Sequence, residues 1–128
     1  MCQFTVIRLT EKVRLYQLRY PIHSSNILCS TFIHDEYTVY KREGEDDYVF
    51  ELLSVQFDAR WYHVFSVQED CPGIDHIGII HFLSGLFTEA SIPILYVNTY
   101  SSNLIFINEE HVQKAVDIMS KHPRIILE

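Results

Sequence analysis

The sequence contains few of the residues that build disulfide frameworks, zinc sites or membrane spans. Only three of its 128 residues are cysteines, and Cys2, Cys29 and Cys71 lie too far apart for a disulfide scaffold or a zinc knuckle. No apolar run is long enough to cross a bilayer. The beginning of the chain also lacks the charged-then-apolar pattern of a signal peptide. These absences predict a cytoplasmic protein with no membrane partner.

Basic residues are also in the minority. The chain has 10 Lys and Arg against 17 Asp and Glu, a net charge of −7 and a pI of about 5.4. This acidity argues against a nucleic acid as the partner, because a phosphate backbone would be repelled. The hydrophobic fraction of 48% indicates a packed globular protein. A chain of 128 residues suits one compact domain, or two small ones that share a core.

No pattern in the sequence supports a metal, a cofactor or a catalytic centre. The seven histidines form no HxH or HxxxH pattern with a carboxylate. The acidic run from Glu43 to Asp47 lacks the spacing of a calcium loop, and there is neither a P-loop nor a GxGxxG motif. Cys29 and Cys71 have no ordered histidine partner. An enzyme acting on amino acids is therefore the least favoured class.

The pattern over residues 60–119 predicts strand, helix, strand, strand and helix. An alternating run from Trp61 to Val67 gives the first strand. The second, 92–99, alternates too little to be half-exposed, so we expect it to be covered on both faces or to lie near an interface. A turn at 100–103 precedes the third strand at 104–107. This order is a split βαβ layout with two helices on one face of a sheet.

Helical periodicity predicts which side chains the two helices bury. Asn108 is expected to cap the second helix, with Glu109 and Glu110 in its first turn. Gly78 and Gly85 lower helix propensity, so we expect them to allow close approach of backbone. The buried stripes are Ile79, Phe82, Leu83, Leu86, Phe87 and Ala90 in the first helix, and Val112, Ala115, Val116 and Met119 in the second.

The first half of the chain predicts a degraded copy of this order. Strands at 4–9 and 13–18 are expected to join at Thr10-Glu11. A short helix at 23–29, a strand at 32–40, a charged loop at 42–47 and a strand at 48–52 are expected to follow. No linker composition marks a boundary near 55–58, so the two halves should pack directly on each other.

The turn from Asp70 to Asp75 is the strongest candidate for a binding site. It leads into the first helix of the second half, where backbone N–H groups suit an anionic group such as the α-carboxylate of an amino acid. Gly73 removes a side chain that would block this approach. The alternative is an ordinary strand-to-helix turn that Asp75 caps.

The sequence resembles the small tandem ACT-domain proteins, including bacterial members and the ACT halves of the cytosolic arginine sensors of animals. The resemblance implies an α+β, ferredoxin-like fold with a degenerate ACT-like unit at 1–57 and an ACT unit at 58–128. It is weaker in the first half, at Thr10-Glu11-Lys12-Val13 and Tyr37-Thr38-Val39. In the second half it lies in Gly78-Ile79-Ile80, Ser91-Ile92-Pro93-Ile94, the run from Asn98 to Ile107, and Glu109-Glu110-His111-Val112.

The resemblance implies a regulatory protein that binds an amino acid at an interface of ACT units and signals by changed association. A homodimer and a protein partner are also implied. Pro93 lacks a backbone donor, and Asn103-Leu104 stand where members carry Asp and an aromatic residue. A ligand-free dimerisation or protein-interaction module is therefore the alternative. By position, the resemblance and the turn nominate Asp70, Gly73, Ile74, Asp75, Ile92, Pro93, Ile94 and Asn98 as ligand-binding residues.

Overall fold

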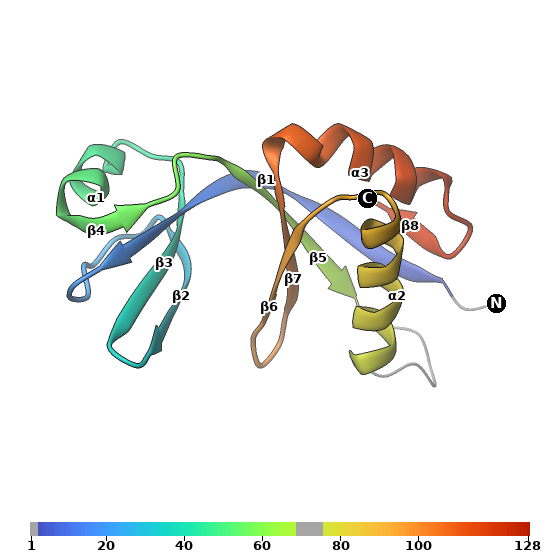
Figure 1. The fold of residues 1–128 in the computed structure, drawn as a ribbon, viewed down its shortest axis with the longest axis horizontal. Helices are drawn as coiled ribbons and strands as arrows, with labels where there is room; N and C mark the ends of the chain where they lie inside the picture. Colours follow the sequence, from blue (N-terminus) through green and yellow to red (C-terminus); the bar gives the residue numbers. More distant parts are fainter. Residues whose placement is uncertain (1–2, 69–75) are drawn as a thin grey trace. The chain divides into compact units, whose positions relative to one another are not determined.

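The protein has an α+β fold, as the sequence predicts. The computed structural model describes residues 3–68 and 76–128. Eight strands and three helices lie within these ranges (Figure 1). In chain order they are β1 (Phe4–Leu18), β2 (Ile27–Ile33), β3 (Glu36–Arg42), α1 (Asp47–Leu53), β4 (Ser54–Phe57), β5 (Tyr62–Gln68), α2 (His76–Glu89), β6 (Ile94–Asn98), β7 (Asn103–Asn108), α3 (Glu109–Lys121) and β8 (Ile125–Leu127).

The chain divides into two compact units. Unit 1 comprises Met1–Thr10 and His63–Glu128, and unit 2 comprises Glu11–Tyr62. Strand β1 therefore contributes residues to both units. The sequence division into ACT-like units at 1–57 and 58–128 stays a prediction, because compactness does not test whether unit 2 is ACT-like.

In unit 1, β1 has a strand neighbour that the sequence did not predict. The short strand β8 pairs with it in parallel, with Phe4 opposite Ile125 and Val6 opposite Leu127. Strand β1 also neighbours β5, β5 neighbours β7, and β7 pairs antiparallel with β6. A three-residue strand carries no readable alternation, so sequence periodicity could not find β8.

Helices α2 and α3 cover one face of the unit 1 sheet (Figure 1). Both predicted stripes are confirmed, since each residue is either buried or packed against the core. Burial of these stripes stabilises the unit, and α3 is the more clearly amphipathic of the two helices, with a polar outer face. The core is formed by Phe4, Val6, Phe65, Val67, Ile79, Leu83, Phe87, Ile92, Ile105, Ile107, Val112, Ala115, Met119 and Ile125.

The predicted cap of α3 is also confirmed. The Oδ1 atom of Asn108 accepts a hydrogen bond from the backbone N–H of Glu110 at 3.1 Å. Glu109 and Glu110 lie in the first turn and Lys121 lies in the last, as the helix dipole favours. The helix therefore begins where the sequence predicts.

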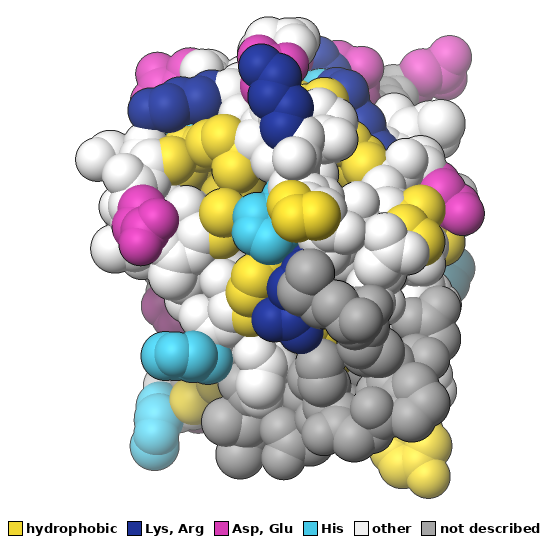
Figure 2. Space-filling model, turned by 90° about the vertical axis from the view of Figure 1, so that its right-hand side faces the viewer, with side chains coloured by type: hydrophobic (Ala, Val, Ile, Leu, Met, Phe, Trp, Pro, Cys, Tyr) yellow, Lys and Arg dark blue, Asp and Glu magenta, His cyan; other side chains and the backbone are white. Residues whose placement is uncertain are grey.

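Aromatic side chains and an arginine close the core of unit 1 beside β8. The guanidinium of Arg124 lies 5.0 Å from the ring centre of Phe4 and 4.9 Å from that of Phe82. The ring of His122 packs edge-on against Phe82, with 5.0 Å between the ring centres. Figure 2 shows hydrophobic, cationic and histidine side chains adjoining on this side of the molecule. Such cation–π contacts cover an apolar edge with a hydrated charge.

Strand β6 differs from the sequence prediction in its exposure. Ile94 and Tyr96 pack against the unit 1 core, while Leu95 points away and is 37% exposed. Within unit 1 the strand is therefore covered on one face, and the expected covering of both faces is wrong. The alternative, that this strand lies near an interface, stays a prediction.

In unit 2, β1 pairs antiparallel with β3 and with β4, and β3 pairs antiparallel with β2. Tyr16, Leu18, Val39 and Phe50 form its small core, and α1 contributes only Phe50. Tyr48 and Leu52 on the same helix are 70% and 80% exposed. The predicted strand at 48–52 is wrong, because this apolar run is a short helix that buries a single aromatic residue.

Three more predictions for the first half are wrong. Strand β1 runs through Thr10-Glu11 without a turn, since the chain has no residue there that favours one. Residues 27–33 form β2 instead of a helix, and the hydroxyl of Ser24 caps only a local turn by accepting from the N–H of Asn26. The expected strand at 32–40 is broken by a hairpin at His34 and Asp35, whose φ angles are 50° and 64°. Neither residue is glycine, which hid this turn from the sequence.

Gly85 does not serve a close approach of backbone, contrary to the sequence prediction. A Cβ added at Gly85 meets nothing within 4 Å, whereas one at Gly44 would lie 2.5 Å from Nδ2 of Asn26. Gly85→Ala should therefore raise the free energy of unfolding by about 0.5–1 kcal/mol, as removal of backbone freedom in a helix does. Urea denaturation measures this change. The matched variant Gly44→Ala should destabilise, and equal effects of the two variants would contradict the assignment.

Candidate functional site

Unit 1 has a hollow at the end of its sheet where β5 ends and the β6–β7 hairpin turns. We call it the hairpin hollow. Its volume is about 260 Å³, and it is therefore of a size for a small molecule, below the range of about 300–1,000 Å³ that drug-sized ligands occupy. It is lined by Ser66, Val67, Gln68, Asn98, Thr99, Tyr100, Ser101, Ser102 and Asn103.

The hairpin is held in shape by its own backbone. Asn98 and Asn103 are opposite each other in the β6–β7 ladder. The N–H of Thr99 donates to the carbonyl oxygen of Ser102 at 2.8 Å, and the hydroxyl of Thr99 donates to the same oxygen at 3.4 Å. Because the turn is closed by these bonds, the remaining polar side chains are not needed to fold it. Tyr100 at the tip is fully exposed.

Strand β5 supplies the other wall. Alternation along the strand places Phe65 and Val67 in the core and Ser66 and Gln68 on the opposite face. The amide nitrogen Nε2 of Gln68 donates to the hydroxyl oxygen of Ser66 at 3.3 Å. This bond leaves the hydroxyl hydrogen of Ser66 and the amide oxygen of Gln68 with hydrogen-bonding capacity.

Of the residues nominated from the sequence, the four that the structure describes are not all brought together. Asn98 lines the hairpin hollow, whereas Ile92 is 4% exposed in the core, Ile94 packs against that core and Pro93 is exposed. Ile94 and Asn98 are at opposite ends of β6, about 13 Å apart at the rise of a strand. The other four, Asp70, Gly73, Ile74 and Asp75, lie outside the described residues, as does the predicted cap by Asp75.

Sequence reasoning missed the polar residues of the hollow other than Asn98. The sequence predicts only a turn for residues 100–103 and only a strand for Ser66 and Thr99, and it assigns no role to Gln68. A signal was present, because Ser66 and Gln68 end an apolar strand and a turn of hydroxyl and amide residues follows two elements later. Only the β5–β7 neighbourhood places these segments side by side.

Unit 2 has a second hollow, of about 300 Å³, on the sheet face that Gln17 and Thr38 share. Nε2 of Gln56 donates to Oε1 of Gln17 at 2.6 Å across β1 and β4. Asp58 borders it, and bonds from Arg60 outweigh burial and lower the pKa of Asp58 to about 2. Arg60 donates from Nε and Nη2 at 3.0 Å each, so this carboxylate is already occupied by a partner within unit 2.

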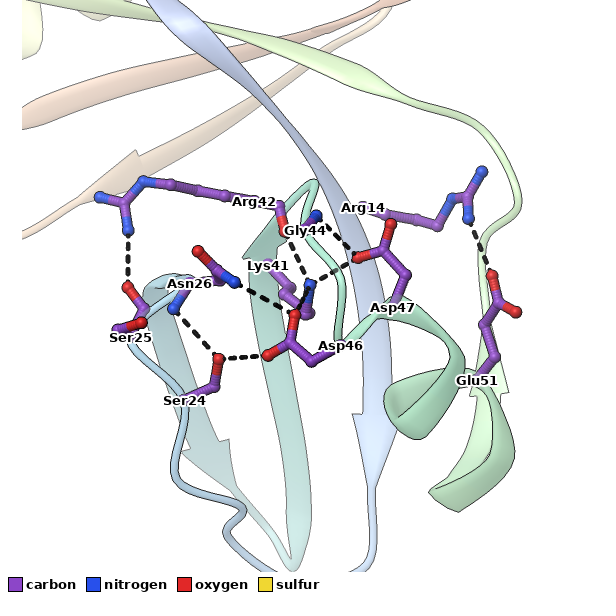
Figure 3. A network of polar contacts seen from close by, with 10 residues as sticks. All are labelled: Arg14, Ser24, Ser25, Asn26, Lys41, Arg42, Gly44, Asp46, Asp47 and Glu51. Carbon is purple, nitrogen blue, oxygen red and sulfur yellow. Dashed lines mark hydrogen bonds and ion pairs between the residues drawn. The ribbon is translucent and has the colours of Figure 1, made fainter.

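The most buried charge in unit 2 belongs to a network around Lys41 (Figure 3). The Nζ atom donates to Oδ1 of Asp46 at 2.7 Å, to Oδ1 of Asp47 at 2.5 Å and to the carbonyl oxygen of Arg42 at 2.8 Å. Asp46 also accepts from the hydroxyl of Ser24 at 2.6 Å. All three hydrogens of the Lys41 ammonium are donated to these acceptors. The network therefore holds the loop before α1 in place, and it offers no site to a ligand.

Histidines do not gather into a metal site in the parts of the chain that the structure describes. His63 instead lies between two charged side chains of unit 1. Nη2 of Arg8 is 3.3 Å from its Nδ1, and Oε1 of Glu109 is 3.3 Å from its Nε2. An imidazole with its hydrogen on Nε2 satisfies both contacts, which makes this a structural link between β1, β5 and α3. Of the described helices, none is long and apolar enough to cross a membrane.

The hairpin hollow falls inside a segment that matches a known family. Residues 62–121, from the start of β5 to the end of α3, match the family model of the ACT domain. This segment is an ACT-type domain. Its strands β5, β6 and β7 and its helices α2 and α3 are the elements of the predicted split βαβ layout. No curated protein matches the chain significantly.

Solved structures support the fold around this ACT-type domain. A Vibrio cholerae protein of unknown function, described as a possible transport protein, aligns with a TM-score of 0.74 at 11% identity, over 93% of this chain and 89% of that one. An Agrobacterium tumefaciens protein aligns with a TM-score of 0.73 at 16% identity, over 100% of this chain and 96% of that one. At such identities the likeness shows the fold alone.

Proposed function

We propose that this protein is a non-enzymatic regulator whose ACT-type domain binds an amino acid in the hairpin hollow. ACT domains are regulatory and not catalytic, and they suggest a small-molecule-binding role. The observation that carries the proposal is that a hollow of about 260 Å³, lined mostly by hydroxyl and amide side chains, lies within the matched domain.

The chemistry of the lining suits both charged ends of a free amino acid. The α-carboxylate accepts hydrogen bonds, which hydroxyls such as those of Ser66 and Ser101 donate. The α-ammonium donates them, and amide oxygens such as those of Asn98 and Gln68 accept. Hydroxyl and amide groups at one rim therefore provide both kinds of partner. Among the lining residues that the structure describes there is no histidine, cysteine or carboxylate that would act as a base or a nucleophile.

Ligand binding becomes a signal through association. A ligand can bind more tightly to one packing of a homodimer, or to the form that a partner protein recognises. It then shifts the equilibrium between the two forms by its difference in affinity for them. The hairpin lies at the edge of the unit 1 sheet, since β6 pairs only with β7 among the described strands. A ligand beside that edge is well located to change what the edge contacts. The net charge of −7 supports a cytoplasmic protein partner over nucleic acid.

A thermal-shift screen of the common amino acids with the full chain tests the proposal. At least one should raise the unfolding midpoint, because a ligand that binds only the folded state stabilises it, by about 2.7 kcal/mol at a hundredfold excess over Kd. Gln68→Ala should abolish the shift. Gln113→Ala, on the exposed face of α3, should leave it unchanged. No shift with any amino acid at millimolar concentration would instead support the ligand-free interaction module.

A further inference from the structure

Helix α1 and strand β4 in unit 2 expose a group of large apolar side chains. Tyr48 and Leu52 are 70% and 80% exposed, and Leu53, Val55 and Phe57 are also exposed. We call these five residues the α1 patch. Tyr48 and Leu52 are one helical turn apart and lie on the same side of α1. Exposed apolar groups of this kind mark interaction surfaces, whereas single exposed side chains do not.

The fold of α1 does not depend on the α1 patch. Phe50 is the buried residue of this seven-residue helix. At its beginning, Oδ1 of Asp47 accepts from Nζ of Lys41 at 2.5 Å and from the N–H of Gly44 at 3.2 Å (Figure 3). At its end, the N–H of Ser54 donates to the carbonyl oxygen of Phe50. A helix this short is not stable alone, so these contacts hold it and present the patch on a preorganised support.

Carboxylates flank the helical part of the patch. Residues 43–53 contain no Lys or Arg, and their carboxylates are Glu43, Glu45, Asp46, Asp47 and Glu51. The cations that pair with them are less exposed than the carboxylates. Arg14 donates to Glu51 at 3.1 Å, and its side chain is 16% exposed against 40% for Glu51. The side chain of Lys41 is 0% exposed. A partner at this surface therefore meets negative charge.

Two observations decide which occupant fits the patch. Strand β4 has only four residues, and its pairing with β1 shifts register between Gln17 and Leu18. Such a short, irregular edge is a poor template for another strand, so a partner contacts side chains and not backbone. A second copy would bring like charges together in a chain whose net charge is already −7. Lys or Arg beside an apolar surface complements both parts of the patch.

We propose that the α1 patch docks a protein partner that presents an apolar helix face flanked by Lys or Arg. Tyr48 and Leu52 pack against the apolar face, and the carboxylates beside them attract the flanking cations. The patch belongs to unit 2 and the hairpin hollow to unit 1, so this inference does not depend on amino-acid binding.

Two synthetic helical peptides test the inference with the full chain. Both carry leucines at i, i+3, i+4 and i+7, flanked by lysines in one peptide and by glutamates in the other. Fluorescence anisotropy should show the lysine peptide binding about 10-fold or more tightly than the glutamate peptide, and more weakly as salt is added. Equal binding of the two peptides, or no saturable binding of the lysine peptide at millimolar concentration, would overturn the inference.

Matched variants show whether the lysine peptide binds at the patch. Leu52→Ser should weaken its binding about 10-fold, because it removes an apolar anchor. The variant should stay folded, as circular dichroism can check, since the side chain is exposed. Phe32→Ser, at a 65% exposed position of β2, should leave the affinity unchanged. Equal losses in the two variants would mean non-specific binding and would overturn the inference.

Sedimentation velocity of the full chain tests the other occupant. The wild type and Leu52→Ser should have the same association state, because the α1 patch is not an interface between copies. A dimer that Leu52→Ser dissociates would assign the patch to a second copy of this chain and would overturn the inference.

Discussion

Replacing Lys41 with methionine should lower the free energy of unfolding by about 3–5 kcal/mol, because removing one partner of a buried ion pair leaves the others unpaired. The side chain is 0% exposed and donates to Asp46, Asp47 and the carbonyl of Arg42. Methionine fills the same space and donates nothing. Urea denaturation followed by circular dichroism measures the loss.

Two controls separate the charge from the shape. Lys121→Met, on the exposed last turn of α3, should cost less than about 1 kcal/mol. Adding Asp46→Asn and Asp47→Asn to Lys41→Met should recover part of the loss, since a buried network without ions is often nearly neutral relative to the intact one. A Lys41→Met variant as stable as Lys121→Met would contradict the role assigned to the network.

The acid dependence of the same variant provides an independent measurement. Burial would raise the pKa of Asp46, but hydrogen bonds from Lys41, Ser24 and Asn26 together outweigh it and lower the pKa from 3.8 to about 2. Between about pH 2 and pH 3.8 the unfolded chain therefore binds more protons at this residue than the folded chain does. This part of the stability is complete above pH 3.8 and is lost as the pH falls towards 2. Without Lys41 the lowering shrinks, so Lys41→Met should lose less stability to acid than the wild type.

Phe65→Ala should have an effect of similar size in unit 1, where truncation of a buried phenylalanine costs about 3–5 kcal/mol. Phe65 is 0% exposed and belongs to the core between the sheet and helices α2 and α3. The loss combines the transfer of the ring into water with the cavity that remains. Urea denaturation again measures it.

The matched variant is Phe32→Ala in β2, where the side chain is 65% exposed. It should change stability by less than about 0.5 kcal/mol, as surface substitutions do. Similar losses from the two variants would mean that Phe32 is buried in solution by a contact outside the single chain. A small loss from Phe65→Ala would contradict the assigned core.

The second half of the chain was predictable because its signals are local and agree with one another. The stripe through Ile79, Leu83 and Phe87 repeats at helical spacing over about two turns, and Asn108 caps the next helix by a bond to a residue two positions on. In the first half the signals conflict. The run from Tyr48 to Leu53 is aromatic and apolar enough for a strand, yet it forms α1. Whether such a short segment forms a helix or a strand is decided by the residues that it packs against in the folded chain.

The candidate site shows the same division. Asn98 was nominated from its position in the chain, but Ser66 and Gln68 were not, because their nearness to the hairpin depends on β5 and β7 being neighbours. Pairing of segments far apart in sequence leaves no periodic trace in either segment. Residues that form a site by such pairing are therefore visible only in the folded chain.

By itself, the sequence determined the α+β class, the helices α2 and α3 with their buried faces, and the acidic charge, because each depends on local periodicity or composition. Only the tertiary structure decided that β1 continues through both units beside β8, that Lys41 is buried among carboxylates, and that a polar hollow forms at the β6–β7 hairpin. These features depend on which distant segments meet, and contact between distant segments is fixed by packing.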